Sequence, residues 1–131
     1  MQSRPTALEL LGAVRSFLED DVVPVLEGRR RFHALVAANV LSIVERELAG
    51  EEEVLLAEWS ALGRVLGEAG EPPPRLAALR AAVRSRTKTL AARIRSGDAD
   101  AGSWASEARA QVRASVRDTL RVANPHALGS E

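Results

Sequence analysis

The sequence predicts an all-α fold: a single-domain bundle of about five helices around a central apolar helix over residues 29–49. Apolar residues recur at every third or fourth position in several stretches, which is the period of a helix that packs one face on a core. No stretch shows the period-two alternation of a half-buried strand. From Phe32 to Val44 no residue is formally charged and apolar side chains fall on both sides of the helical wheel, which is typical of an interior helix.

The central helix is expected to follow Gly28 and to end at Gly50, where a glycine can form the C-cap. Two adjoining apolar stripes run along it. The first consists of Phe32, Leu35, Val36, Val40 and Ile43, and the second of Ala37, Leu41, Val44 and Leu48. Because apolar side chains surround most of this helix, we expect other helices to pack around it. The apolar run is shorter than the roughly 20 residues that cross a bilayer, so no membrane span is expected.

The remaining helices are expected on either side of the central one. Thr6 and Glu9 have the spacing of a capping box, so a first helix should begin near Ala7 and stop before Pro24. Its apolar face comprises Leu10, Leu11, Val14, Phe17 and Leu18, and Val25 and Leu26 should pack the following connector onto the core. Further helices are expected over residues 51–68, 75–96 and 103–122. We take residues 1–125 as one helical bundle domain and residues 126–131 as a flexible tail.

Composition sets bounds on the function. The chain has 131 residues, 18 basic and 18 acidic side chains and no cysteine, so neither net charge nor thiol chemistry points to a partner or reaction. Acidic residues predominate in the N-terminal half and basic residues in the C-terminal half. No apolar run of a secretory signal precedes Glu9, and the cytoplasm is therefore the expected location.

Three arginines, Arg29, Arg30 and Arg31, stand where the central helix begins. Positive charge at a helix N-terminus is disfavoured by about 0.3 to 1 kcal/mol per side chain, so the cluster suggests an anion or an acidic partner surface nearby. With His33 it forms our candidate for a partner-binding or anion-binding patch. The alternative is that the acidic residues close in sequence neutralise it; these are Glu19, Asp20, Asp21 and Glu27.

Other polar residues are assigned structural roles or none. Asn39 interrupts the apolar stripes, and burying an amide without partners costs about 1 to 3 kcal/mol; we expect it to be buried and hydrogen-bonded to a loop or helix. The stretch that begins at Asp98 resembles the opening of a calcium loop, but Ser103 stands at the glycine position and Arg109 at the glutamate position. We therefore predict no metal site and no catalytic residue, and the chain is not expected to be an enzyme by itself.

Two predicted helices have strongly basic faces, which carry Arg80, Arg84 and Lys88, and Arg109, Arg113, Arg117 and Arg121. Clustered cations favour nucleic acid, and a nucleic-acid-binding domain is one alternative function. Against it, no helix-turn-helix pattern or aromatic stacking platform is visible. A solvated face, pairing with the acidic half, or docking on an acidic protein explains the same pattern. A third hypothesis is a small-ligand-binding bundle that uses His33 and Asn39, which requires a pocket of about 300 Å³ or more.

The central stretch also carries a resemblance. Its residues are Phe32-His33-x-x-Val36-Ala37-Ala38-Asn39-Val40-Leu41-x-Ile43-Val44-x-Arg46-Glu47-Leu48, and they resemble the core signature of a bacterial family of small all-helical proteins of uncharacterised domain type. Arg4-Pro5-Thr6 with Glu9-Leu10, and Val122-Ala123-Asn124-Pro125, resemble the two ends of that family. In one departure, His126-Ala127-Leu128 stands where an aromatic residue is expected.

The resemblance implies a function. Members are encoded beside a kinase of the aminoglycoside-phosphotransferase type and an acyl-CoA dehydrogenase. It implies an accessory subunit that the kinase needs to phosphorylate the hydroxyl of a γ-hydroxyacyl-CoA, as in levulinate-type acid breakdown, after which the dehydrogenase-like partner eliminates phosphate. ATP and magnesium would belong to the kinase, and this chain would have no cofactor of its own. Self-association stays open if the central helix keeps one face bare.

Overall fold

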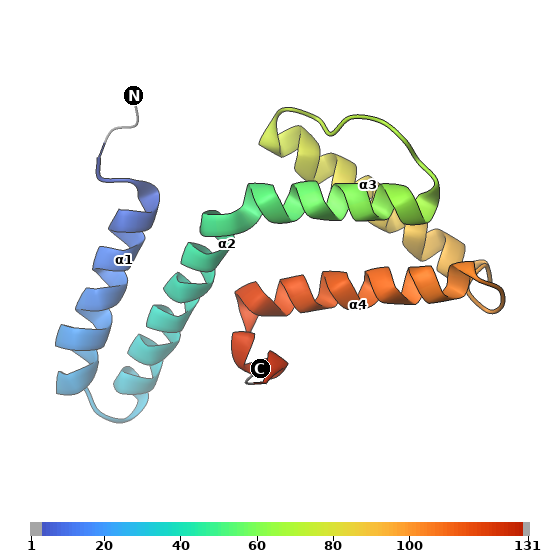
Figure 1. The fold of residues 1–131 in the computed structure, drawn as a ribbon. Helices are drawn as coiled ribbons and strands as arrows, with labels where there is room; N and C mark the ends of the chain where they lie inside the picture. Colours follow the sequence, from blue (N-terminus) through green and yellow to red (C-terminus); the bar gives the residue numbers. More distant parts are fainter. Residues whose placement is uncertain (1–3, 130–131) are drawn as a thin grey trace. The chain divides into compact units, whose positions relative to one another are not determined.

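The computed structural model describes residues 4–129, which form helices joined by short connections (Figure 1). Within this range there is no strand, and the predicted all-α class is confirmed. The elements in order are α1 (Ala7–Phe17), the π-helix η1 (Leu18–Val22), the 3-10 helix η2 (Val23–Val25), α2 (Gly28–Leu66), α3 (Leu76–Arg95), α4 (Trp104–Ala123) and the 3-10 helix η3 (Pro125–Leu128).

The chain divides into two compact units, and α2 contributes residues to both. The N-terminal unit comprises residues 4–50 and Val122–Asn124, and the C-terminal unit comprises Glu51–Arg121 and residues 125–129. No helix within the described part of the chain is both long and apolar enough to cross a membrane.

The first helix begins as predicted, at a complete capping box. The Thr6 hydroxyl accepts a hydrogen bond from the Glu9 backbone N–H at 3.2 Å, and the Glu9 carboxylate accepts one from the Thr6 N–H at 2.7 Å. These two bonds satisfy N–H groups that have no partner within the helix. The α-helix ends at Phe17 and is followed by η1 and then by η2, which contains Pro24. The proline ring prevents the helix from continuing beyond this point.

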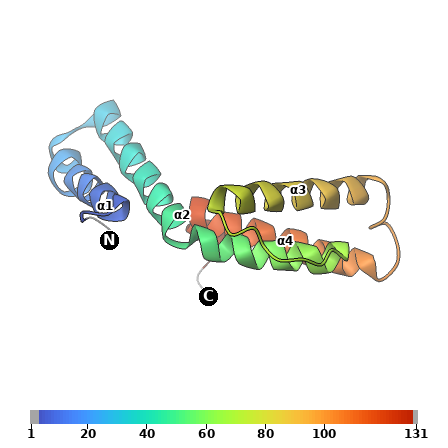
Figure 2. The same ribbon diagram turned by 90° about the horizontal axis from the view of Figure 1, so that it is seen from above.

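In the N-terminal unit, α1 packs beside the first half of α2 as a helical hairpin (Figures 1 and 2). Arg15 Nε donates a hydrogen bond to Glu45 Oε2 at 2.6 Å, and this bond raises the pKa of the Arg15 guanidinium. A Cβ on Gly12 would lie 3.2 Å from Glu45 Oε1, so the absent side chain leaves room for the ion pair. Arg46 Nε donates to the carbonyl of Val122 at 2.8 Å and ties that segment to the same unit.

Two expectations about the central helix are wrong. Helix α2 runs without a break from Gly28 to Leu66, so the helices predicted over residues 29–49 and 51–68 are one. Gly50 has no positive φ, which a glycine C-cap requires. Nor is the apolar stretch surrounded by other helices, because Phe32 is 62% exposed and Val40 is 51% exposed.

The exposure has a simple cause. Within the N-terminal unit the only other long helix is α1, which can cover only one side of α2. The hydrophobic residues buried there are Val23, Ala34 and Ala38. The two alanines lie four residues apart, on one side of α2. The remaining circumference of this half of α2 has no helix of its unit against it, and its apolar side chains remain exposed.

The C-terminal unit holds the larger core, in which α3 and α4 pack with the second half of α2 (Figure 2). Its buried cluster consists of Trp59, Leu62, Leu79, Val83, Leu90 and Ala108. Helices α3 and α4 match the predicted helices over residues 75–96 and 103–122 to within one residue. Helix α3 contributes Leu79, Val83 and Leu90 to this cluster and α4 contributes Ala108. The apolar patterns of the two helices also predict Leu76, Val112 and Val116 to face inward, and this is wrong, because all three are exposed.

Buried polar groups fix how these helices meet. Arg86 is 9% exposed, and its Nη1 donates to the Trp59 carbonyl at 2.7 Å. Its guanidinium carbon lies 3.9 Å from the centroid of the Trp59 ring, and its Nε lies 3.2 Å from Glu68 Oε2. Trp104 Nε1 donates to the Val65 carbonyl at 2.7 Å and so joins α4 to α2. Each buried donor thus has a partner, as burial requires.

A short helix lies near the end of the described residues. Pro125–Leu128 form η3, within the segment that the sequence predicts to be a flexible tail. Residues 130–131 of that tail lie outside the described residues.

Candidate partner-binding surface

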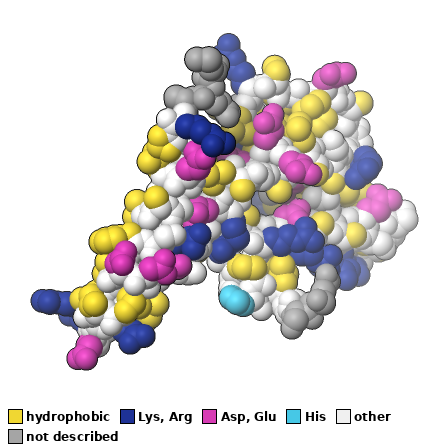
Figure 3. Space-filling model, turned by 60° about the vertical axis from the view of Figure 1, so that its left-hand side comes forward, with side chains coloured by type: hydrophobic (Ala, Val, Ile, Leu, Met, Phe, Trp, Pro, Cys, Tyr) yellow, Lys and Arg dark blue, Asp and Glu magenta, His cyan; other side chains and the backbone are white. Residues whose placement is uncertain are grey.

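The connection between α1 and α2 places apolar and basic side chains together at the surface. Val25 is 78% exposed and Phe17 is 57% exposed, and Arg29, Arg30 and Arg31 are all exposed. Gly28, with φ of 59°, begins α2, a conformation that glycine adopts without strain. We call these five exposed residues the hairpin tip. Figure 3 shows hydrophobic, basic and acidic side chains side by side at the lower left, where this connection lies.

Among the described residues, the tip arginines form no ion pair with nearby acids. Within residues 4–129, none of Arg29, Arg30 and Arg31 forms an ion pair, and Glu19 pairs with Arg15 at 3.2 Å instead. Arg29 Nε donates a hydrogen bond to His33 Nε2 at 3.2 Å, and the His33 ring lies edge-on to Phe32. The structure therefore brings Arg29 and His33 together, and among the described residues it shows no ion pair between these arginines and the acids considered from the sequence.

Val25 corrects another expectation, because it was predicted to pack on the core. Leu26 is half-buried, but the Val25 side chain in η2 is exposed to solvent. Val25 directly follows Pro24 in a three-residue 3-10 helix, which is too short to provide a buried face. In the sequence, the position of Val25 directly after a proline was the available indication that its side chain would be exposed. Phe17 gave no such signal, since it continues the apolar pattern of α1.

A second exposed surface runs along α2. We call it the α2 stripe: Phe32, Leu35, Val36, Asn39 and Val40. Its apolar members are between 43% and 62% exposed. Asn39 is exposed too, which corrects the expectation that it is buried and hydrogen-bonded. It lies on the part of α2 that α1 does not cover, so its amide needs no partner within the protein.

The basic faces of α3 and α4 each include one arginine that forms an ion pair. Arg80 binds Glu51 with two hydrogen bonds, of which Nη2 to Oε2 measures 2.7 Å. The hydrogen bond from Arg80 lowers the pKa of Glu51 below its ordinary value of 4.5. On α4, Arg121 pairs with Asp118 at 3.1 Å. Among the described residues, Arg109, Arg113 and Arg117 form no ion pair and are exposed.

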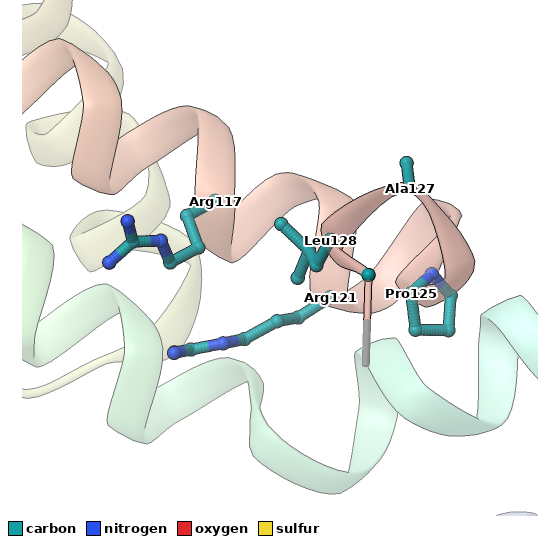
Figure 4. A pocket seen from close by; sticks show the side chains of 6 residues that line it. Arg117, Arg121, Pro125, Ala127 and Leu128 are labelled. Atoms are coloured by element: carbon teal, nitrogen blue, oxygen red, sulfur yellow. The ribbon is translucent and has the colours of Figure 1, made fainter. Parts of the chain in front are cut away.

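Two pockets lie in the C-terminal unit, away from the residues assigned to a small ligand. One of about 380 Å³ lies between α4 and η3 and includes Arg117, Arg121 and Leu128 (Figure 4). The other, of about 580 Å³, is lined by Ile94, Ala99, Asp100, Ala108, Arg109, Val112 and Arg113. Neither His33 nor Asn39 lines either pocket. No group of three or more potential metal ligands occurs within residues 4–129.

The fold and these surfaces define a small all-α protein in which one helical unit has a consolidated core and the other exposes apolar and basic side chains. The chain belongs to the family described as domain of unknown function (DUF6285), whose sequence model matches residues 24–127. The match includes Val25 and the three arginines of the tip, the whole α2 stripe, α3 and α4, and it begins after α1. Comparison with curated proteins and with solved structures gave no match.

Proposed function

We propose that the protein is a non-catalytic accessory subunit that binds another protein through its hairpin tip. One observation carries this proposal: three adjacent arginines at the start of α2 are exposed and have no acidic partner within the described residues. Two of the most exposed large hydrophobic side chains precede them in sequence, Phe17 at the end of α1 and Val25 in η2.

The physical argument concerns charge first. The N-terminus of a helix carries partial positive charge, so each added cation costs about 0.3 to 1 kcal/mol. An acidic partner surface would supply the missing counter-charges and remove this cost. Arginine and aromatic side chains are also the residue types that contribute most to binding energy at protein interfaces. The tip has residues of both types, the three arginines and Phe17. Val25 lies between them in sequence.

The identity of the partner rests on the family resemblance of the central stretch. The proposed partner is an aminoglycoside-phosphotransferase-like kinase that phosphorylates a hydroxyacyl-CoA in short-chain acid catabolism, acting in sequence with an acyl-CoA dehydrogenase. In this proposal the kinase binds ATP and magnesium. The part played by this chain is to bind and stabilise the active form of the kinase, with Arg29, Arg30 and Arg31 as the principal contacts and His33 supporting Arg29.

Co-expression with a kinase of this type from the same genome tests the proposal. The wild-type protein should co-elute with the kinase, and the triple variant Arg29→Glu, Arg30→Glu, Arg31→Glu should not. The matched control is Arg109→Glu, Arg113→Glu, Arg117→Glu, which reverses the same number of exposed, unpaired arginines on α4 and should co-elute. Circular dichroism checks that both variants keep their helices. Equal retention of both variants, or loss of both, would contradict a contact at the tip.

A further inference from the structure

The N-terminal unit has a second exposed surface, the α2 stripe, for which we infer a different binding partner. We propose that the α2 stripe is covered by the α2 stripe of a second copy of this chain, the two helices lying antiparallel about a two-fold axis near Asn39. This inference goes beyond the proposed function, because it concerns pairing between copies and uses residues other than those of the tip.

The stripe includes residues at the spacing of a helix-pairing seam. Phe32, Val36 and Asn39 of the stripe and the half-buried Ile43 that follows it are separated by four, three and four residues, which is the heptad spacing of two helices that pack along their length. Leu35 and Val40 flank this seam and are 47% and 51% exposed. On the helical wheel the seam lies opposite Ala34 and Ala38, the buried side of α2. It is therefore open to a further helix.

The N-terminal unit has little core of its own, which is a reason for it to pair. Its buried hydrophobic residues are one valine and two alanines, Val23, Ala34 and Ala38. Two helices alone rarely bury enough apolar surface to be stable, and stable helical folds usually pack at least a third or fourth helix on the same core. Two hairpins joined along α2 would place the exposed stripes in a shared interior.

The chemistry of the stripe fits a second copy. In a two-fold interface each group near the axis meets its own copy, so a charged residue there would repel itself. No residue from Phe32 to Val44 is formally charged. The one amide of the stripe, Asn39, can both donate and accept hydrogen bonds, so two copies of Asn39 can satisfy each other. An asparagine at such a position also fixes the register of paired helices.

The direction of pairing follows from the tip. Parallel helices would bring the two Arg29–Arg31 clusters together and cause repulsion. In the antiparallel arrangement, Arg30 lies nine residues from the axis, so the two clusters are separated by about 27 Å along the helices at 1.5 Å per residue. That distance exceeds the screening length of about 8 Å at physiological salt. Both tips then remain open to a different partner.

The area involved predicts a reversible dimer. Four apolar side chains that are each about half exposed, with Asn39 and Ile43, form a small interface, below the standard size of about 1,600 Å² in total for specific complexes. We therefore expect a dissociation constant on the order of micromolar. The full-length chain should sediment as a dimer at about 100 µM and dissociate on dilution.

Charge reversal at the axis provides the decisive experiment, because it distinguishes self-pairing from binding to anything else. Sedimentation velocity should show that Asn39→Asp and Asn39→Lys are each monomeric at the concentration where the wild type is dimeric. An equimolar mixture of the two variants should recover the dimer, since each aspartate then faces a lysine. Asn39 is exposed, so neither change disturbs the core of the monomer.

A matched pair of valines provides the control for surface apolarity. Val40 on the stripe and Val14 on α1 are both 51% exposed. Val40→Glu should weaken dimerisation at least about tenfold, and Val14→Glu should leave it unchanged. A wild type that stays monomeric at about 100 µM, or a mixture of the Asn39 variants that stays monomeric, would overturn the proposal and leave the stripe to another protein. Equal effects of the two valine changes would also overturn it.

Discussion

At the scale of single residues, the Glu51–Arg80 pair makes a specific contribution that depends on pH. The Glu51 side chain is 16% exposed and receives two hydrogen bonds from the Arg80 guanidinium. The hydrogen bond from Arg80 favours the charged carboxylate and therefore lowers its pKa in the folded protein. The unfolded chain, which lacks this partner, takes up the proton first as the pH falls.

The sign of the effect follows from linkage. Stability from this pair is present above the ordinary carboxyl pKa of 4.5 and is lost as the pH falls through the lower, folded-state pKa. Glu51→Gln should therefore cost about 0.2 to 1 kcal/mol at pH 7 and lose less stability than the wild type on acidification below pH 4.5. Urea unfolding at a series of pH values measures this. Glu52→Gln, which removes an exposed carboxylate one residue further on, should behave like the wild type.

Asn39 shows which structural features can and cannot be predicted from residue types alone. The sequence marks it as unusual, because the positions around it on the helical wheel are apolar. Whether it is buried depends on which helices cover that side of α2, and this is a property of the tertiary structure. The three tip arginines were found as a cluster for a local reason, the dipole at a helix start. Their lack of acidic partners could only be seen in the fold.

At the scale of elements, signals confined to a few residues predicted the helices well. The Thr6–Glu9 capping box located the start of α1, and the prolines before Arg75 located the start of α3. Gly50 did not mark the end of a helix as expected. A glycine within a helix costs only about 1 kcal/mol relative to alanine, and the glutamates that follow it are good helix formers. They continue α2 rather than begin a new helix.

Arg86 and Gly63 determine how α2 and α3 pack, and this yields a second prediction about stability. A Cβ on Gly63 would lie 2.5 Å from Arg86 Nη1 and 2.9 Å from the Glu68 carbonyl oxygen. The backbone oxygen cannot move away as a flexible side chain can. Gly63→Ala should therefore destabilise the protein by about 1 to 3 kcal/mol, the usual cost of overpacking.

Gly50 supplies the matched control, since it also lies within α2 but a Cβ there would meet nothing within 4 Å. Gly50→Ala should stabilise the helix by about 0.5 to 1 kcal/mol. The midpoints of chemical unfolding should thus move in opposite directions for the two changes. A Gly63→Ala variant as stable as Gly50→Ala would show that the Arg86 contacts do not fix the packing of α2 on α3.

At the scale of the whole molecule, helical periodicity and the absence of strand patterns sufficed to predict the all-α class. Periodicity could not show how apolar surface is distributed between the two units. An apolar helix in an interior and an apolar helix with an exposed face have the same sequence pattern. In this chain Phe32, Leu35, Val36 and Val40 of the stretch from Phe32 to Val44 are exposed. The sequence therefore indicated where the surfaces lie but assigned the α2 stripe to the core.

This exposure changes the physical basis of the proposed accessory role. A helix buried on all sides would only support the fold, whereas exposed tip and stripe residues can make contacts with other chains. In the proposed assembly, the stripe pairs two copies and the tip contacts the kinase. The C-terminal unit has its own consolidated core around Leu62 and Leu79.

The most direct test of the central claim is the rate at which the purified kinase phosphorylates a γ-hydroxyacyl-CoA alone, with the wild-type protein, and with the triple variant Arg29→Glu, Arg30→Glu, Arg31→Glu. We predict that the wild-type protein raises the rate at least about tenfold, a difference of about 1.4 kcal/mol, and that the variant raises it little or not at all. A kinase that is equally fast without this protein, or equally stimulated by the variant, would contradict an accessory role exerted through the hairpin tip.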